Sequence, residues 1–184
     1  MLWLKKLFQQ IRESAAMYTT VNGFLNDWKV EASLTLQVLD KLTDASLSQA
    51  VSDAQPRTIG EIAWHIVQSV GFFLNEIGLQ QEIPAPEGAS AAAIAQAYRR
   101  ASDSAIAELS AKWAGKDDQL DQPIKMFGFI DTTAAGVLSM LVRHQIHHRG
   151  QITILMRQAG LVAPGIYGPN EEETAAMKAA HGQS

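Results

Sequence analysis

The sequence predicts an all-α protein: a four-helix bundle with a long crossover connection, a short N-terminal helix and a short C-terminal helix. Apolar residues recur at three- and four-residue steps along most of the 184-residue chain, which is the period of an amphipathic helix. Alternating runs of apolar and polar β-branched residues, which would indicate strands, are missing. With 47% hydrophobic residues, a chain of this length can bury one core, so we expect a single domain over residues 1–184.

The first helical segments lie before residue 43. Residues 1–16 form a short amphipathic extension whose apolar stripe is flanked by Lys5 and Lys6. Docking on a membrane surface would need a stronger cationic signal, so packing on the bundle or on a partner subunit is favoured. A long helix is expected from about Val21 to Leu42. Its apolar positions are Leu25, Trp28, Ala32, Leu36 and Leu39.

Two further helices are predicted from their capping residues. Thr58 followed by Glu61 is a capping box, in which a hydroxyl and a carboxylate satisfy free backbone amides at a helix start. That helix is expected to run to about Ile77. Ser90 is the expected N-cap of an alanine-rich helix that continues to about Trp113.

The last part of the chain carries the crossover and the final helices. Residues 115–128 are polar and rich in turn formers, as suits a long connection or the rim of a pocket. The last long helix is expected over residues 131–159, ending before Gly160, a typical C-terminal glycine. Asn170, followed by three glutamates, predicts one more short helix.

Composition excludes several classes of function. Lys and Arg number 15 against 19 Asp and Glu, giving a net charge of −4, which argues against a nucleic-acid-binding protein. The absence of cysteine excludes disulfides, thiolate metal ligands and a cysteine nucleophile. No apolar run reaches the length of about 20 residues that spans a membrane, and no signal-peptide pattern is visible. We therefore expect a cytoplasmic protein without a membrane partner.

Two histidines of the last long helix point into its core. At 100° per residue, His148 lies about 20° and His144 about 60° from Leu141 at the centre of the apolar face, whereas His147 lies about 120° away on the flank. A hydrogen-bonded core pair is the alternative interpretation, but the inner face of this helix offers no Asp or Glu, and unpaired imidazoles are costly to bury. Histidines four apart on one face therefore indicate a metal site.

The phase of His65 does not decide its role. It lies about 120° from the apolar centre of its own helix, which alone favours a flank position. The helix is apolar around most of its girth, however, with Phe72 and Ser69 near the same azimuth. His65 therefore faces either a second neighbour or a cavity, and periodicity leaves this question open.

Two extended motifs resemble those of one family. His-Gln-Ile-His-His-Arg-Gly-Gln-Ile at 144–152, with Leu-Met-Arg-Gln-Ala-Gly at 155–160 and Tyr-Gly-Pro at 167–169, is similar to the last helix and tail of the DinB/YfiT-like metalloenzyme superfamily. Thr-Ile-Gly-Glu-Ile-Ala-Trp-His-Ile at 58–66 resembles the second-helix motif of that DinB-like superfamily. The resemblance covers about residues 26–168, which we take as the core bundle.

The DinB-like resemblance implies a four-helix bundle, often a homodimer, with one divalent transition metal per chain held by His65, His144 and His148. Such a site leaves coordination positions open, as catalytic sites do. Nitrogen ligands suit several metals; the resemblance favours nickel or zinc, with iron also compatible. Because relatives include transferases and isomerases that use low-molecular-weight thiols, we expect a thiol-dependent S-transferase acting on a small-molecule substrate.

Two other functions stay open, namely a metal-dependent hydrolase and a non-catalytic metal- or ligand-binding bundle, because no general acid or base is identifiable by spacing. Gln151 is expected either to orient a ligand or substrate or to lie on a solvated face. Tyr167 is expected either to close the pocket mouth or to cap the bundle end, and Trp64 is a further pocket candidate. Arg149 is expected to pair with a carboxylate at the subunit surface, or else to be solvated.

Overall fold

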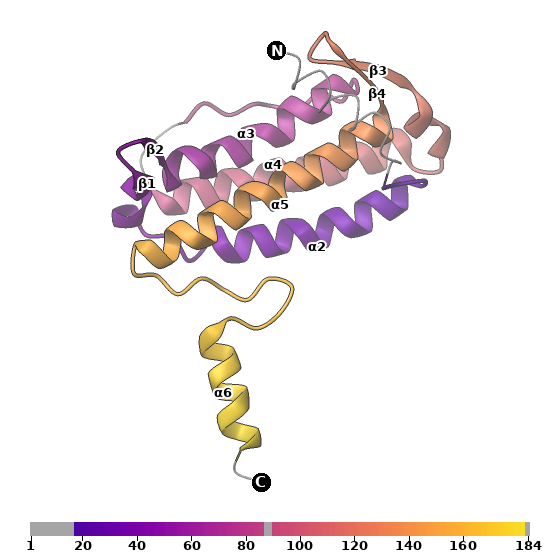
Figure 1. The fold of residues 1–184 in the computed structure, drawn as a ribbon. Coiled ribbons are helices and arrows are strands. Elements are labelled where there is room, and N and C mark those ends of the chain that lie inside the picture. Colours follow the sequence, from indigo (N-terminus) through magenta and orange to yellow (C-terminus); the bar gives the residue numbers. More distant parts are fainter. Residues whose placement is uncertain (1–16, 87–89, 183–184) are drawn as a thin grey trace.

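The computed structural model describes residues 17–86 and 90–182. Four long helices lie side by side in it: α2 (Val21–Leu39), α3 (Ile59–Glu76), α4 (Ala91–Trp113) and α5 (Ala134–Gln158) (Figure 1). The predicted all-α class is confirmed. The expected N-terminal helix falls in residues 1–16, outside the described part of the chain.

The order of the four helices in space differs from their order in the chain. Helix α3 packs against α4 and α5, and α2 packs against the same two helices. Consequently α2 and α3 stand at opposite corners, as do α4 and α5. The α4–α5 connection is the crossover predicted from residues 115–128, and the α2–α3 connection is a second diagonal link that the sequence did not indicate.

Each long helix begins at a side-chain cap. The Thr58–Glu61 capping box forms as predicted. The Thr58 hydroxyl accepts a hydrogen bond from the Glu61 backbone N–H, and the Glu61 carboxylate accepts one from the Thr58 backbone N–H at 2.7 Å. Each such cap stabilises the fold by about 1 kcal/mol. Helix α2 ends at Leu39 rather than Leu42. The N-caps of α2, α4 and α5 are Thr20, Ser90 and Thr133.

Two small antiparallel hairpins interrupt the diagonal connections. They pair β1 (Ala50–Ser52) with β2 (Gln55–Thr58), and β3 (Pro123–Met126) with β4 (Ile130–Thr133). The sequence predicts plain connections here, because the strands have only three or four residues and two of them contain proline, which is depleted in strands. Short 3₁₀ turns precede the hairpins, at Asp44–Ser48 and Asp117–Asp121.

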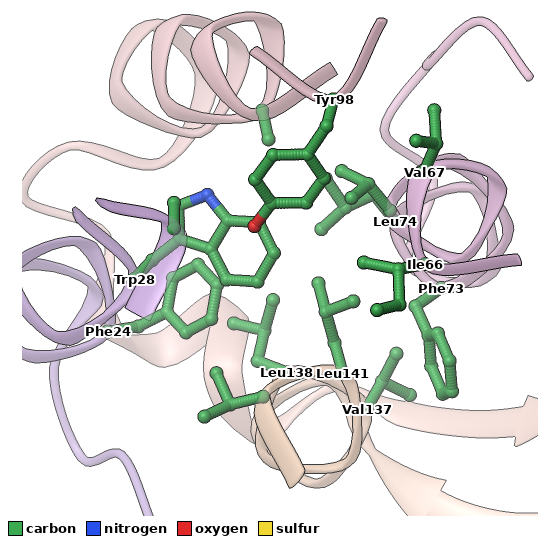
Figure 2. Packing of buried hydrophobic residues seen from close by; sticks show 14 of the residues in the cluster. Phe24, Trp28, Ile66, Val67, Phe73, Leu74, Tyr98, Val137, Leu138 and Leu141 are labelled. Carbon is green, nitrogen blue, oxygen red and sulfur yellow. The ribbon is translucent and has the colours of Figure 1, made fainter. Parts of the chain in front are cut away.

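An aromatic core fills the space between the helices (Figure 2). Trp28 of α2 is fully buried, and its indole N–H donates to the Ser102 hydroxyl of α4 at 3.1 Å. Burying a large apolar side chain stabilises the fold by about 1.5–3 kcal/mol, so these contacts hold the helix positions that define the site below. Other members of this core are Phe24, Phe73, Tyr98, Leu138 and Leu141.

The short C-terminal helix α6 (Glu171–His181) projects away from the bundle (Figure 1). Its predicted start at Asn170 is correct, because Asn170 is its N-cap. None of its residues is buried, and Arg157 of α5 pairs with Glu172 at its first turn, with Nη1 2.5 Å from Oε1. Across residues 17–86 and 90–182, no helix is long and apolar enough to span a membrane.

Candidate metal centre

Three imidazoles converge where α3 packs against α5. Nε2 of His144 lies 3.0 Å from Nε2 of His65 and 3.2 Å from Nε2 of His148. One ligand atom from each of the three residues lies within 4.8 Å of the others, so this cluster could hold a metal ion.

The helices explain how the cluster forms. His144 and His148 are one turn apart and share one face of α5, as their phase predicts. His65 lies off the apolar centre of α3, and the structure answers the question that its phase left open: α3 has two packing neighbours, and His65 faces the second, α5.

The ring nitrogens fit a cation better than they fit each other. Nδ1 of His148 lies 2.7 Å from Oε1 of Gln151, so Nδ1 carries the proton and Nε2 presents a lone pair. A proton on Nε2 of His144 cannot point at both neighbouring nitrogens, whereas a metal ion would accept a lone pair from each ring. The three residues therefore fit a metal, as Gln151 holds one of them in the required tautomer.

Burial favours the neutral form of all three rings. Burial lowers the pKa of His65 from 6.5 to about 4 and that of His144 to about 3. Burial also lowers the pKa of His148, although its hydrogen bond with Gln151 acts in the opposite direction. The positive charge of Arg57 contributes to lowering all three pKa values. Neutral imidazole is the form that binds metal, so protons compete weakly at this site.

A cleft of about 1050 Å³ opens beside His65. It follows the exposed side of the first turns of α3 and the end of β2, so that one imidazole of the cluster forms part of its wall. Trp64 lies in this wall, as does Arg57, which the sequence analysis did not single out. The polar and aromatic side chains of its lining are Arg57, Thr58, Glu61, Trp64, His65 and Gln68.

An aromatic pair lies next to His144. The Phe73 ring packs against the His144 ring, with centroids 5.4 Å apart, and against Phe127 of the β3–β4 hairpin at 5.9 Å. The helical period of the sequence predicts that Phe73 is an inward apolar residue of α3. Its contact with His144 could not be predicted in this way, because it depends on how α3 and α5 pack. Phe127 could not be found from periodicity, because it lies in a turn.

Tyr167 and Arg149 lie away from the cleft. The Tyr167 hydroxyl donates to the Glu31 carboxylate at 2.9 Å and accepts from Arg149 at 2.5 Å. Arg149 is buried and pairs with Glu31 inside the same chain. The expectation that Arg149 meets a carboxylate at the subunit surface is therefore wrong. The side of α5 that carries Arg149 packs against α2, and the charge of Arg149 can be buried there because Glu31 of α2 supplies the counter-charge.

His147 does not join the cluster. It is exposed and its ring contacts that of His148, with centroids 5.0 Å apart, but none of its atoms belongs to the group that could hold a metal. This placement agrees with its flank position in the helical phase.

Comparisons with known proteins agree on the fold. Residues 17–182 match the model of the DinB family. The chain is 41% identical over 162 residues to the uncharacterized protein YrdA of Bacillus subtilis. The aligned region covers 86% of this chain and 95% of that protein.

Two solved structures are also similar. A DinB-like protein from Bacillus cereus is 40% identical, with a TM-score of 0.76 over 82% of this chain and 100% of that one. The DinB-like protein YjoA of Bacillus subtilis shares the fold at 17% identity and a TM-score of 0.61, over 80% of this chain and 99% of that one.

Proposed function

The chain belongs to the DinB family, and we propose that it is a metal-dependent S-transferase in which His65, His144 and His148 hold one divalent transition metal. The observation that carries the proposal is the convergence of three neutral imidazole nitrogens beside an open cleft. Nickel or zinc is the proposed occupant, and iron is also compatible with nitrogen ligands.

The metal would supply Lewis acidity, which lowers the pKa of a thiol that occupies an open coordination position. The chain's own residues prepare that position. Gln151 holds the tautomer of His148, Phe73 packs against the ring of His144, and the cleft brings the substrate to His65. Trp64 gives the cleft an apolar wall against which the carbon skeleton of a small molecule can lie.

Thiol chemistry suits this site better than hydrolysis. Among the described residues, no carboxylate contributes to the histidine cluster or makes a hydrogen bond with its rings. A metal ion would lower the pKa of bound water as well as that of a bound thiol. A thiol starts from a pKa of about 8.5 and needs less help to lose its proton to solvent, whereas hydrolysis usually also draws on a general acid or base. In the proposed reaction, that proton passes to water in the cleft, the sulfur forms a bond to an electrophilic carbon, and the leaving group departs with its bonding electrons.

Hydrolysis is the second candidate, and one residue favours it. Among the described residues, Glu61 is the carboxylate that lines the cleft. It lies one helical turn before His65 in the chain. Glu61→Gln keeps the capping box, because glutamine also fills that position, but removes the base. A hydrolase would lose ester or amide hydrolysis in this variant, whereas an S-transferase would keep its conjugation rate.

A homodimer in the cytoplasm is also part of the proposal. It is supported by the family's frequent assembly into dimers and by helix α6, whose Met177 is 53% exposed on an element with no buried residue. Sedimentation equilibrium of the full chain tests the assembly, with twice the chain mass as the expected result and the single-chain mass as the contrary one.

A cobalt- or nickel-substituted sample tests the function. Adding a thiol should produce sulfur-to-metal charge-transfer absorption, and the loaded protein should speed conjugation of that thiol with a reactive electrophile. His148→Ala should do neither. If thiols leave both the spectrum and the conjugation rate unchanged, the S-transferase proposal is contradicted. Metal-dependent hydrolysis in the same samples would then favour a hydrolase. Inactivity in both assays would favour a non-catalytic binding bundle.

A further inference from the structure

One arginine in the cleft wall has no ion-pair partner among the described residues. Arg57 is exposed and lines the cleft together with His65. Within residues 17–86 and 90–182, no carboxylate lies within ion-pair distance of its guanidinium. Unpaired arginine in a concave site is a recognition element for carboxylates and phosphates, which its planar fork can bind through two hydrogen bonds.

The surroundings of Arg57 add to this positive character. The metal cluster has three neutral ligands, so a divalent ion would keep its full charge at the other end of the cleft. Glu61 is the opposing charge, and its Oε2 is engaged by the backbone N–H and the hydroxyl of Thr58 at 2.7 and 3.2 Å. These bonds hold the Glu61 carboxylate on Thr58 and leave Arg57 without an ion pair to it. With a divalent ion in the histidine cluster, the described lining would carry a net positive charge, although the chain as a whole has a net charge of −4.

The path between the two cationic ends is apolar on one side. Trp64 lies next to His65 in the cleft wall, one turn after Glu61. From Thr58, the neighbour of Arg57, to His65 the helix rises about 10 Å. A molecule that reaches both ends is therefore a small one, with a metal-binding atom and a negative group on the order of 10 Å apart.

We infer that the cleft selects anionic small molecules, in which Arg57 binds a carboxylate, Trp64 contacts the carbon skeleton and the histidine cluster receives the donor atom. Arg57 is thus a specificity-determining residue for the substrate. The inference rests on the proposed function in one respect, that the donor atom is a thiol sulfur.

Two thiols of equal length test the inference. The probes are 6-mercaptohexanoate and 6-mercaptohexan-1-ol, titrated into the cobalt-substituted full chain near neutral pH while the absorption spectrum is followed. The wild-type chain should bind the carboxylate about fivefold more tightly than the alcohol, the upper range for a partly exposed ion pair. Added salt should reduce this preference, because the pair is accessible to solvent.

Two variants of equal charge change identify the residue responsible. Arg57→Gln should bind both thiols equally, whereas Arg100→Gln, which removes an exposed arginine of α4 outside the cleft lining, should keep the wild-type preference. Circular dichroism of each variant checks its fold. A wild-type chain without charge preference, or an Arg57→Gln variant that retains it, would overturn the inference while leaving thiol binding intact.

A probe without sulfur separates the inference from the proposed function. If neither thiol changes the cobalt spectrum, the S-transferase proposal fails. The metal-free full chain is then tested with 4-phenylbutyrate and 4-phenylbutan-1-ol by ligand-observed NMR. A preference for the carboxylate that disappears in Arg57→Gln would still support an anion-selective cleft, and equal binding of both compounds would overturn it.

Discussion

Arg149 of α5 and Glu31 of α2 form a buried ion pair, with Nη2 2.8 Å from Oε2 and side chains only 2% and 7% exposed. Nη1 of Arg149 also donates to the backbone carbonyl of Glu31 at 3.0 Å and to the Thr35 hydroxyl at 3.3 Å, and Tyr167 contacts both members of the pair. Arg149 directly follows His148. The pair therefore fixes the rotation of α5 at the point where the helix presents its histidines.

Removing one member of this pair should be strongly destabilising. Arg149→Met leaves the Glu31 carboxylate buried without its counter-charge, which costs about 3–5 kcal/mol of unfolding free energy. The double variant Glu31→Leu, Arg149→Met should lose much less than the sum of the two single changes, because no uncompensated charge remains. Urea denaturation measures all of these chains. Additive losses would show that the two side chains do not interact in solution.

Gln151 should control metal affinity through His148. In Gln151→Ala the hydrogen bond to Nδ1 is lost, and the imidazole is no longer held in the tautomer and orientation that present Nε2. Loss of such a partner weakens metal binding about 10-fold to 100-fold. Competition with a chromophoric chelator measures the affinity. Gln158→Ala, an exposed change on the same helix, is the matched control, and equal affinities in the two variants would contradict the role of Gln151.

Stability of the metal-free chain should fall as the pH is lowered. Burial holds the pKa of His65 at about 4 and that of His144 at about 3, against 6.5 for an exposed histidine. Between those values and 6.5 the unfolded chain binds more protons than the folded one, so their contribution is complete above pH 6.5 and is lost as the pH falls towards the folded values.

Thermal unfolding across this pH window measures the effect. Because carboxylates also titrate at its acidic end, the useful quantity is the difference between the wild-type chain and His144→Gln, whose melting temperature should depend less steeply on pH. Identical slopes would show that the His144 ring is protonated equally in the folded and unfolded chains.

Local signals in the sequence were sufficient for the starts of the helices α3, α4 and α6 and for two of the three clustered histidines. The caps at Thr58, Ser90 and Asn170 depend on neighbouring residues alone, and they begin helices as predicted. The inward direction of His144 and His148 follows from the geometry of one helix. The resemblance, rather than periodicity, added His65, because its role depends on which helix packs against the flank of α3.

The parts that the sequence did not predict depend on long-range contacts. From the sequence alone, Arg149 resembles a surface residue, because its partner Glu31 lies 118 positions earlier in the chain. The one hint in the sequence was that the Glu31 carboxylate lies three residues after the apolar position Trp28, and so on the same face of its helix. Likewise, the two hairpins are stabilised by pairing across turns rather than by long apolar strands. Arg57 lies in such a hairpin, which is why its place beside His65 became apparent only in the folded chain.

Metal content of the purified chain is the most direct test of the three-histidine centre. Protein prepared without chelator and analysed by mass spectrometry of the elements should contain about one nickel or zinc ion per chain, since three imidazoles bind these metals tightly. His65→Ala, His144→Ala and His148→Ala should each lose the metal, whereas His147→Ala, whose ring is exposed and outside the cluster, should keep it. Loss of metal in His147→Ala together with retention in His148→Ala would contradict the proposed centre.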